Sequence, residues 1–105
     1  MQIENLTKEK GVLTGENNLW QYNLGKVKKN VPVTFKLLLK DVEHSSVKFG
    51  CPSCTTGKAA QKEKDVEIEI TYKAVDAKDR PFTKTVTETL KNGTQVAIKF
   101  NGIIV

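Results

Sequence analysis

Two cysteines separated by two residues, Cys51 and Cys54, form the one spacing in the sequence that is typical of redox or metal chemistry. In a redox enzyme such a pair lies at the start of a helix inside a βαβ unit, and no such unit is readable here. A structural zinc site needs four ligands. The chain adds a single histidine, His44, so a complete site would need a second chain or another kind of ligand. A disulfide between the two cysteines would close a very short loop and remove little entropy from the unfolded chain.

The interpretation we favour is that Cys51 and Cys54 are thiols that pack in an ordered loop or stay free. Together with His44 they are weak candidates for a metal site. His44 follows Glu43 directly, but a general base also needs a nucleophile and a pocket around it. We therefore expect a histidine in a surface turn, and we predict no catalytic residue, no bound metal and no cofactor.

Three other groups of residues could carry chemistry, and each has a simpler structural interpretation. Glu67 and Glu69 could be paired carboxylates, but on a solvated strand face such residues rarely have perturbed pKa values. Trp20 and Tyr22 could stack on a sugar, but their alternation with Leu24 favours core positions. One strand face carries a row of threonines that could recognise an ordered surface such as ice, although threonine is simply common on the wet face of a sheet; the row is Thr83, Thr85, Thr87 and Thr89.

The composition favours one small domain without a nucleic-acid or membrane partner. The chain has 105 residues, of which 38% are hydrophobic, so it can hold one core but not two. Its net charge of +5 comes from 16 lysines, one arginine (Arg80) and 12 acidic residues. The lysines are scattered, which is typical of a solvated surface rather than of a nucleic-acid interface. No signal peptide or spanning segment is recognisable, so we expect cytoplasmic synthesis without a signal peptide.

The hydrophobic pattern predicts strands. Valine, isoleucine and threonine make up 11, 6 and 11 residues respectively, and these side chains pack well on pleated sheets. Period-two alternation is strict over residues 31–40, and alternation also predicts strands over 66–72 and 95–105. The segment 91–94 contains Asn92-Gly93, which is typical of a type I′ hairpin turn, and it predicts a partner strand over 82–90. Further strands are expected over 19–24 and 42–49.

The remaining segments are less regular. Residues 1–16 are predicted to be an N-terminal arm or an edge strand, because 3–6 and 12–13 could each pair at an edge. Residues 25–30 are predicted to be a turn. Residues 50–65 are predicted to be a long loop, with a single helical turn over 59–64. Gly102 interrupts a strand face and indicates a bulge or a close approach of the backbone. The whole reads as one all-β domain over 1–105, an antiparallel sandwich of about seven strands.

Several segments resemble a known family. The run Trp20-Gln21-Tyr22-Asn23-Leu24-Gly25-Lys26-Val27 is similar to the aromatic-x-x-Gly-x-Val opening of a bacterial and phage Ig-like family of unknown function, related to the ASH/Hydin-type immunoglobulin-like domains. The strand 33–39, the segment 51–56, the strand 83–87 and the ending 96–105 match in place. The family commonly has Cys-Gly-Cys-Thr where this chain has one more residue between its cysteines. The resemblance implies an immunoglobulin-like sandwich that acts as a binding or structural module and not as an enzyme.

The function expected from the sequence is therefore that of a non-enzymatic structural or binding module. The first hypothesis is a small component of a larger assembly, such as a bacteriophage capsid decoration or another virion protein. Its partners would then be many-copy capsid or tail subunits, or further copies of itself. The second hypothesis is a cytoplasmic or envelope adaptor that binds one protein by adding a strand to an exposed sheet edge. The third is a metal- or thiol-dependent module built on Cys51 and Cys54.

Overall fold

The computed structural model describes residues 1–50, 54–75 and 78–105. These residues form nine strands: β1 (Ile3–Asn5), β2 (Val12–Glu16), β3 (Leu19–Val27), β4 (Val33–Leu39), β5 (His44–Phe49), β6 (Thr55–Lys62), β7 (Asp65–Tyr72), β8 (Arg80–Leu90) and β9 (Gln95–Ile104). The described residues contain no helix, and therefore none of the length and apolarity that crossing a membrane requires.

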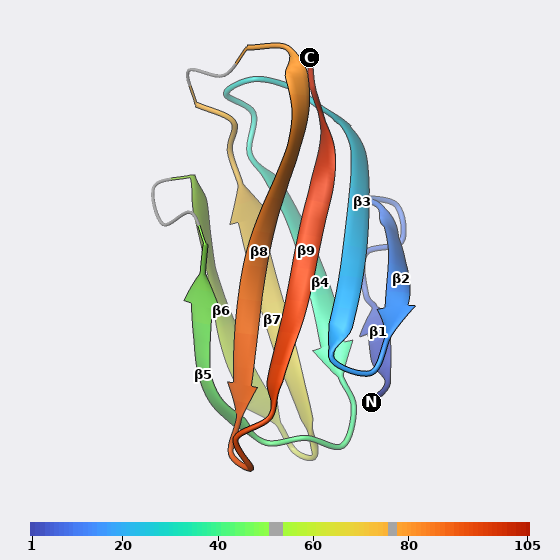
Figure 1. Ribbon diagram of the computed structural model, residues 1–105, viewed down its shortest axis with the longest axis vertical. Helices are drawn as coiled ribbons and strands as arrows, with labels where there is room; N and C mark the ends of the chain where they lie inside the picture. The colour runs from blue at the N-terminus through green and yellow to red at the C-terminus, as the bar shows by residue number, and fades with distance from the viewer. Residues whose placement is uncertain (51–53, 76–77) are drawn as a thin grey trace.

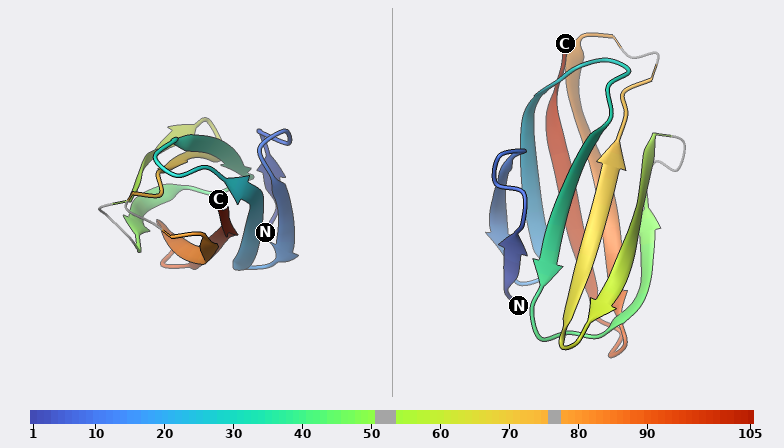
Figure 2. Two further views of the ribbon diagram at one scale, coloured as in Figure 1. Left: turned by 90° about the horizontal axis from the view of Figure 1, so that it is seen from above. Right: turned by 180° about the vertical axis from the view of Figure 1, so that it is seen from behind.

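The strands form two sheets that pack face to face (Figure 1; Figure 2). One sheet has four strands in the order β1-β4-β7-β6, and the other has five in the order β2-β3-β9-β8-β5. Neighbouring strands are antiparallel except for β3 and β9, which run parallel. The protein is thus an all-β sandwich. The hairpins β2–β3, β6–β7 and β8–β9 each stay within one sheet, and the other consecutive strands lie in different sheets.

The core lies between the sheets and follows from the alternation of apolar residues along each strand. In β4, Phe35, Leu37 and Leu39 are fully buried, while the residues between them are half-buried on the outer face. Three aromatic rings, contributed by both sheets, surround the ring of Phe100. Its ring centroid lies 5.5 Å from that of Phe35, 5.6 Å from Tyr72 and 6.4 Å from Phe82. This cluster joins the two sheets at the centre of the sandwich.

The strands predicted over 31–40, 42–49, 66–72, 82–90 and 95–105 are confirmed as β4, β5, β7, β8 and β9, with small differences at their ends. The strand predicted over 19–24 is longer than expected, because β3 continues to Val27 through a bulge at Gly25 (φ 69°). The bulge lies opposite Gly102, where a Cβ atom would come within 2.6 Å of the Gly25 carbonyl oxygen. The predicted close approach at Gly102 is therefore confirmed, whereas the turn predicted over 25–30 begins only after Val27.

The long loop predicted over 50–65 is also wrong, because β6 occupies residues Thr55–Lys62 and no helical turn begins at Ala59. This strand was hard to see because it lies at a sheet edge and buries few side chains; Thr55 is its one fully buried residue. Gly57 allows β6 to lie close to β7. A Cβ atom at Gly57 would be 2.2 Å from the carbonyl oxygen of Glu69.

The hairpin predicted between β8 and β9 is confirmed, but its turn is not type I′. Only Gly93 (φ 89°) has a positive φ, whereas a type I′ turn needs two such residues. The Gly93 amide donates to the Leu90 carbonyl at 2.9 Å, and the Leu90 amide donates to the Thr94 carbonyl at 2.9 Å. This is a three-residue loop with a type I turn followed by a left-handed glycine.

The first sixteen residues form two edge strands, β1 in one sheet and β2 in the other. Tyr22 ties the loop between them to the core. Its ring is buried and stacks on Phe35 at a centroid distance of 4.3 Å. Its hydroxyl lies 3.0 Å from Asn5 Oδ1 and 2.7 Å from the Thr7 carbonyl oxygen. The N-terminal segment is therefore part of the sandwich.

Candidate functional site

Three connections meet at one end of the sandwich, at the bottom of Figure 1. They are residues 40–43 between β4 and β5, residues 63–64 between β6 and β7, and residues 91–94 between β8 and β9. Two of them contain non-glycine residues with positive φ, Asp41 (53°) and Glu63 (56°). Such backbone conformations persist only where the surrounding structure fixes them.

Backbone hydrogen bonds tie these three connections to one another. The Val42 amide donates to the Lys64 carbonyl at 2.9 Å, and the Lys91 amide donates to the Glu43 carbonyl at 3.0 Å. The Asp41 amide donates to Asp65 Oδ1 at 3.0 Å. This hydrogen bond, together with Lys40, whose Nζ lies 3.3 Å from Asp65 Oδ2, lowers the pKa of the Asp65 carboxyl group below its usual value despite some desolvation. The loops thus form one cross-linked unit.

Gln61, near the end of β6, is the side chain that makes the most of these links. Its Nε2 lies 3.1 Å from the Val42 carbonyl oxygen, 3.1 Å from that of Glu63 and 2.9 Å from that of Asp65. Its Oε1 accepts a hydrogen bond of 2.8 Å from the His44 amide. One side chain therefore holds the start of β5 against the turn between β6 and β7.

We expect Gln61→Ala to lower the free energy of unfolding by about 1–2 kcal/mol, because it removes the hydrogen bonds that hold these backbone groups. It should also speed hydrogen exchange of the Val42 amide, whose acceptor lies on the neighbouring turn. Urea denaturation and amide exchange measure the two effects. The control is Lys62→Ala on the same strand, which should change stability by less than about 0.5 kcal/mol. Unchanged exchange at Val42 in the Gln61 variant would show that the loops do not depend on this side chain.

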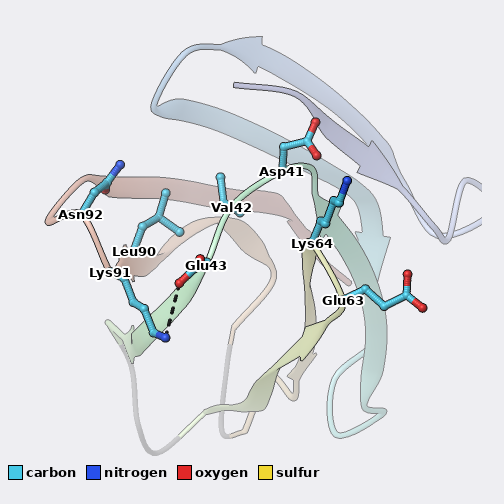
Figure 3. Close-up of a pocket in the computed structure, with 8 residues that line it drawn as sticks. All are labelled: Asp41, Val42, Glu43, Glu63, Lys64, Leu90, Lys91 and Asn92. Carbon is cyan, nitrogen blue, oxygen red and sulfur yellow. Dashed lines mark ion pairs between the residues drawn. The ribbon is translucent and has the colours of Figure 1, made fainter.

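The cross-linked loops enclose an open groove of about 600 Å³ (Figure 3). Val42 and Leu90 form its apolar floor, at the centre of the view. The rim is polar and carries both signs of charge. Glu43 and Lys91 form an ion pair across it at 3.3 Å, and both are exposed. Residues that line the groove are Asp41, Val42, Glu43, Glu63, Lys64, Leu90, Lys91 and Asn92. Its size lies within the usual range of ligand sites.

A buried carboxyl group that is hydrogen-bonded to a histidine lies next to this groove. Glu88 on β8 points into the sandwich and is fully buried. Its two carboxylate oxygens each lie 2.8 Å from Nδ1 of His44, the first residue of β5. Burial raises the pKa of the Glu88 carboxyl group above its usual value, and the hydrogen bond and charge of His44 and the backbone of Ser45 oppose that rise. His44 and Glu88 can therefore share a proton at the edge of the five-stranded sheet that β5 forms.

The structure places the residues predicted to carry chemistry at separate positions. His44 lies in β5 and not in a turn, so the surface-turn interpretation is wrong. Cys51 lies outside the described residues. Cys54 directly precedes β6, with its sulfur 3.6 Å from Thr55 Oγ1, and carries no free thiol, so the expectation of a free thiol is wrong for this residue. His44 is the first residue of β5, which begins at the bottom of Figure 1, whereas Cys54 precedes β6, which begins nearer the top, so the two lie far apart. The described residues hold no cluster of three metal-ligand side chains.

The simpler interpretations of the other groups are largely confirmed. Tyr22 is buried and Trp20 is half-buried against the core. The row of four threonines lies on the outer face of the five-stranded sheet, opposite the buried residues of β8. Glu67 and Glu69 lie on the outer face of the four-stranded sheet, where Glu69 pairs with Lys36 at 3.7 Å.

Sequence reasoning missed Glu88 and Gln61. Glu88 had a readable signal: it lies between Val86 and Leu90 on the apolar face of its predicted strand, where an acidic residue needs a partner. Gln61 had no readable signal, because it was predicted to lie in a loop and its hydrogen bonds are to backbone groups of neighbouring segments.

Comparisons with known proteins show likeness in fold. No family model and no curated protein matches the chain. Among solved structures, the chain is similar to one described as a GspB Siglec domain, with a TM-score of 0.61 and 12% identity over 76% of this chain and 52% of that chain. It is also similar to a family 123 glycoside hydrolase from Clostridium perfringens, with a TM-score of 0.62 and 9% identity over 99% of this chain and 27% of that chain. The chain thus spans about half of the first protein and about a quarter of the second, and the likeness is one of sandwich fold.

Proposed function

We propose that the chain is a non-enzymatic binding module with immunoglobulin-like topology, and that the loop groove is its ligand site. The strand orders support the topology. In immunoglobulin sandwiches one sheet has the order A-B-E-D and the other contains C, F and G. The order β1-β4-β7-β6 corresponds to the first, and β5, β8 and β9 correspond to C, F and G. The resemblance of the sequence to an Ig-like family of unknown function agrees with this proposal.

The observation that carries the proposed site is the cross-linking of three loops into a fixed groove. In the correspondence above, the connections that line the groove are the B–C, D–E and F–G loops. Variable domains bind through loops at this end, the B–C and F–G loops among them. Hydrogen bonds that fix a groove before binding reduce the entropy lost on association. The fold-level likeness to a Siglec domain is in keeping with a binding role.

The partner that fits the groove is a polypeptide segment. An apolar floor of Val42 and Leu90 can take an apolar side chain, and the rim offers carboxylates and ammonium groups to the polar groups around it. This arrangement of apolar centre and polar rim is typical of protein interfaces. We propose that the polypeptide belongs to a larger assembly, with a virion surface as the first candidate.

The test is site-specific photo-crosslinking in cell extract, followed by affinity measurement with the purified partner. A crosslinker at Asn92 should capture the partner. A crosslinker at Lys58, on the outer face of the four-stranded sheet, should not. With the captured partner, Val42→Asp and Lys91→Glu should each weaken binding about tenfold or more, and Lys58→Glu should leave the affinity unchanged. Equal capture from both positions, or full affinity in both groove variants, would contradict the proposed site. A partner that forms a symmetric many-copy particle would support the virion assignment.

A second candidate function is strand addition at β2. This strand lies at the edge of the five-stranded sheet and contains no lysine, and Val12 on it is 63% exposed. Its one charged residue is Glu16 at its end, and exposed edges with few charges are sites where another strand can pair. Capture of a partner from a crosslinker at Thr14 but not from one at Asn92 would favour this mode over the groove.

A further inference from the structure

The end of the sandwich opposite the groove carries most of the net charge. Three segments meet there, at the top of Figure 1, and their described residues are 26–31, 73–75, 78–81 and 103–105. These residues include six basic residues and one acidic residue, whereas the whole chain has a net charge of +5. The basic side chains are all exposed: Lys26, Lys28, Lys29, Lys73, Lys78 and Arg80. We call these three segments the basic end.

Backbone contacts hold the three segments together. The Lys29 amide donates to the Val105 carbonyl at 3.3 Å, and the Asn30 amide donates to the Ala74 carbonyl at 3.0 Å. Arg80 lies opposite Ile104 in the β8–β9 ladder. Asp79 is the acidic side chain among the described residues of these segments, and it is ion-paired with Lys29. Among the described residues of these segments, six basic side chains therefore face one acidic side chain, so the surface is positive.

The basic end also carries apolar side chains. Val31, Val75, Ile103 and Val105 are between 44% and 51% exposed, and they are four of the eight large apolar residues that are exposed in the described chain. Exposed apolar residues gathered at one end of a molecule are a feature of interaction surfaces. The basic end therefore carries both ammonium groups and exposed apolar side chains.

We propose that the basic end docks on an acidic protein surface that has apolar side chains at its centre. Charge complementarity supports the acidic partner, and the apolar residues supply the water-excluding part that such interfaces contain. The cations are lysines with one exception, and lysine lacks the planar fork with which arginine binds phosphates in two-point contacts. No aromatic side chain in the described part of these segments is available to anchor in a lipid interface. These features favour a protein over a nucleic acid or a membrane.

This surface is distinct from the loop groove, which lies at the other end of a molecule 40 Å long. Two surfaces at opposite ends would let one chain connect two partners. The proposal does not depend on the groove, because the two surfaces share no residue.

The first test uses nuclear magnetic resonance with the full chain. The probe is a short synthetic peptide of alternating acidic and leucine residues, and poly-L-glutamate serves as a probe of charge alone. We expect the peptide to shift amide signals of residues 26–31, 73–81 and 103–105. Shifts at the groove instead, or no binding at low ionic strength, would overturn the proposal. Tighter binding of phosphatidylserine vesicles or of single-stranded DNA than of the peptide would overturn the choice of a protein partner.

The second test uses two double variants with the same change in net charge. Lys28→Glu with Lys73→Glu reverses two charges at the basic end, and we expect it to weaken peptide binding about tenfold or more. Lys58→Glu with Lys62→Glu reverses two charges on β6 and should change the affinity by less than about twofold. Equal losses in both would show that net charge alone drives binding and would overturn the site. Val31→Ser with Val75→Ser should weaken binding of the leucine-containing peptide but not of poly-L-glutamate; equal effects on both would remove the apolar part of the proposal. Melting temperatures confirm that each variant is folded.

Discussion

His44→Ala will lower the free energy of unfolding by about 1–3 kcal/mol at neutral pH, since it leaves the buried carboxyl group of Glu88 without its hydrogen bond to the His44 side chain. Glu88 is fully buried and its carboxylate contacts Nδ1 of His44 at 2.8 Å. Urea denaturation of both proteins measures the difference. The matched control is Lys91→Ala, which breaks the exposed ion pair with Glu43 and should cost less than about 1 kcal/mol. Similar small losses in both variants would contradict a buried pair.

The pH dependence of stability in His44→Ala and Glu88→Gln tests whether Glu88 is the titrating group. Because burial raises the folded-state pKa of Glu88 above the usual value of 4.5, the stability that this group contributes is fully present below pH 4.5. It is lost as the pH rises through the folded-state pKa. The loss should be larger in His44→Ala, in which the opposing hydrogen bond is gone, and absent in Glu88→Gln. Asp65 changes stability in the opposite direction. Because its pKa is lowered, the stability that it contributes is present above pH 3.8 and is lost at lower pH. In His44→Ala, which lacks the single histidine of the sequence, a denaturation series from about pH 4.5 to 8 therefore reports on Glu88, and a flat profile for this variant would contradict the assignment.

Phe100→Ala will lower the free energy of unfolding by about 3–5 kcal/mol, the usual cost of removing a large aromatic side chain from a core. Phe100 is fully buried and its ring contacts three aromatic rings from both sheets. The cavity would lie at the centre of the sandwich, where neither sheet can collapse without moving the other. Phe49→Ala, at the half-buried edge strand β5, should cost clearly less under the same denaturation assay. A loss at Phe100 no larger than at Phe49 would show that the aromatic cluster does not hold the sheets together.

The strands that bury every second residue could be predicted from the sequence, because burial on one face leaves a period-two pattern in β4, β7, β8 and β9. β6 could not, because an edge strand that buries little leaves no such pattern. Its register depends instead on Gly57, which lets the backbone approach β7.

The candidate site was predictable only in part. Three loops lie at one end as a consequence of the strand order, but their cross-linking by Gln61 rests on backbone carbonyl positions that no residue pattern encodes. His44 was singled out from the sequence as a weak metal candidate and was then expected in a turn. Its partner Glu88 lies 44 residues away in the chain, and such a pairing becomes visible only when β5 and β8 are placed side by side.

The parallel pairing of β3 with β9 has a mechanical consequence. The first residue of β3 lies near the groove and the last residue of β9 lies at the opposite end (Figure 1). Tension applied at these two points draws the strands past each other along their length, so that their backbone hydrogen bonds are loaded together. β2 precedes β3 in the chain, so a pull that acts at the first residue of β3 does not load the pairing of β2 with β3. If the two ends of the molecule are held by different partners, the β3–β9 ladder is the pairing whose hydrogen bonds share the load.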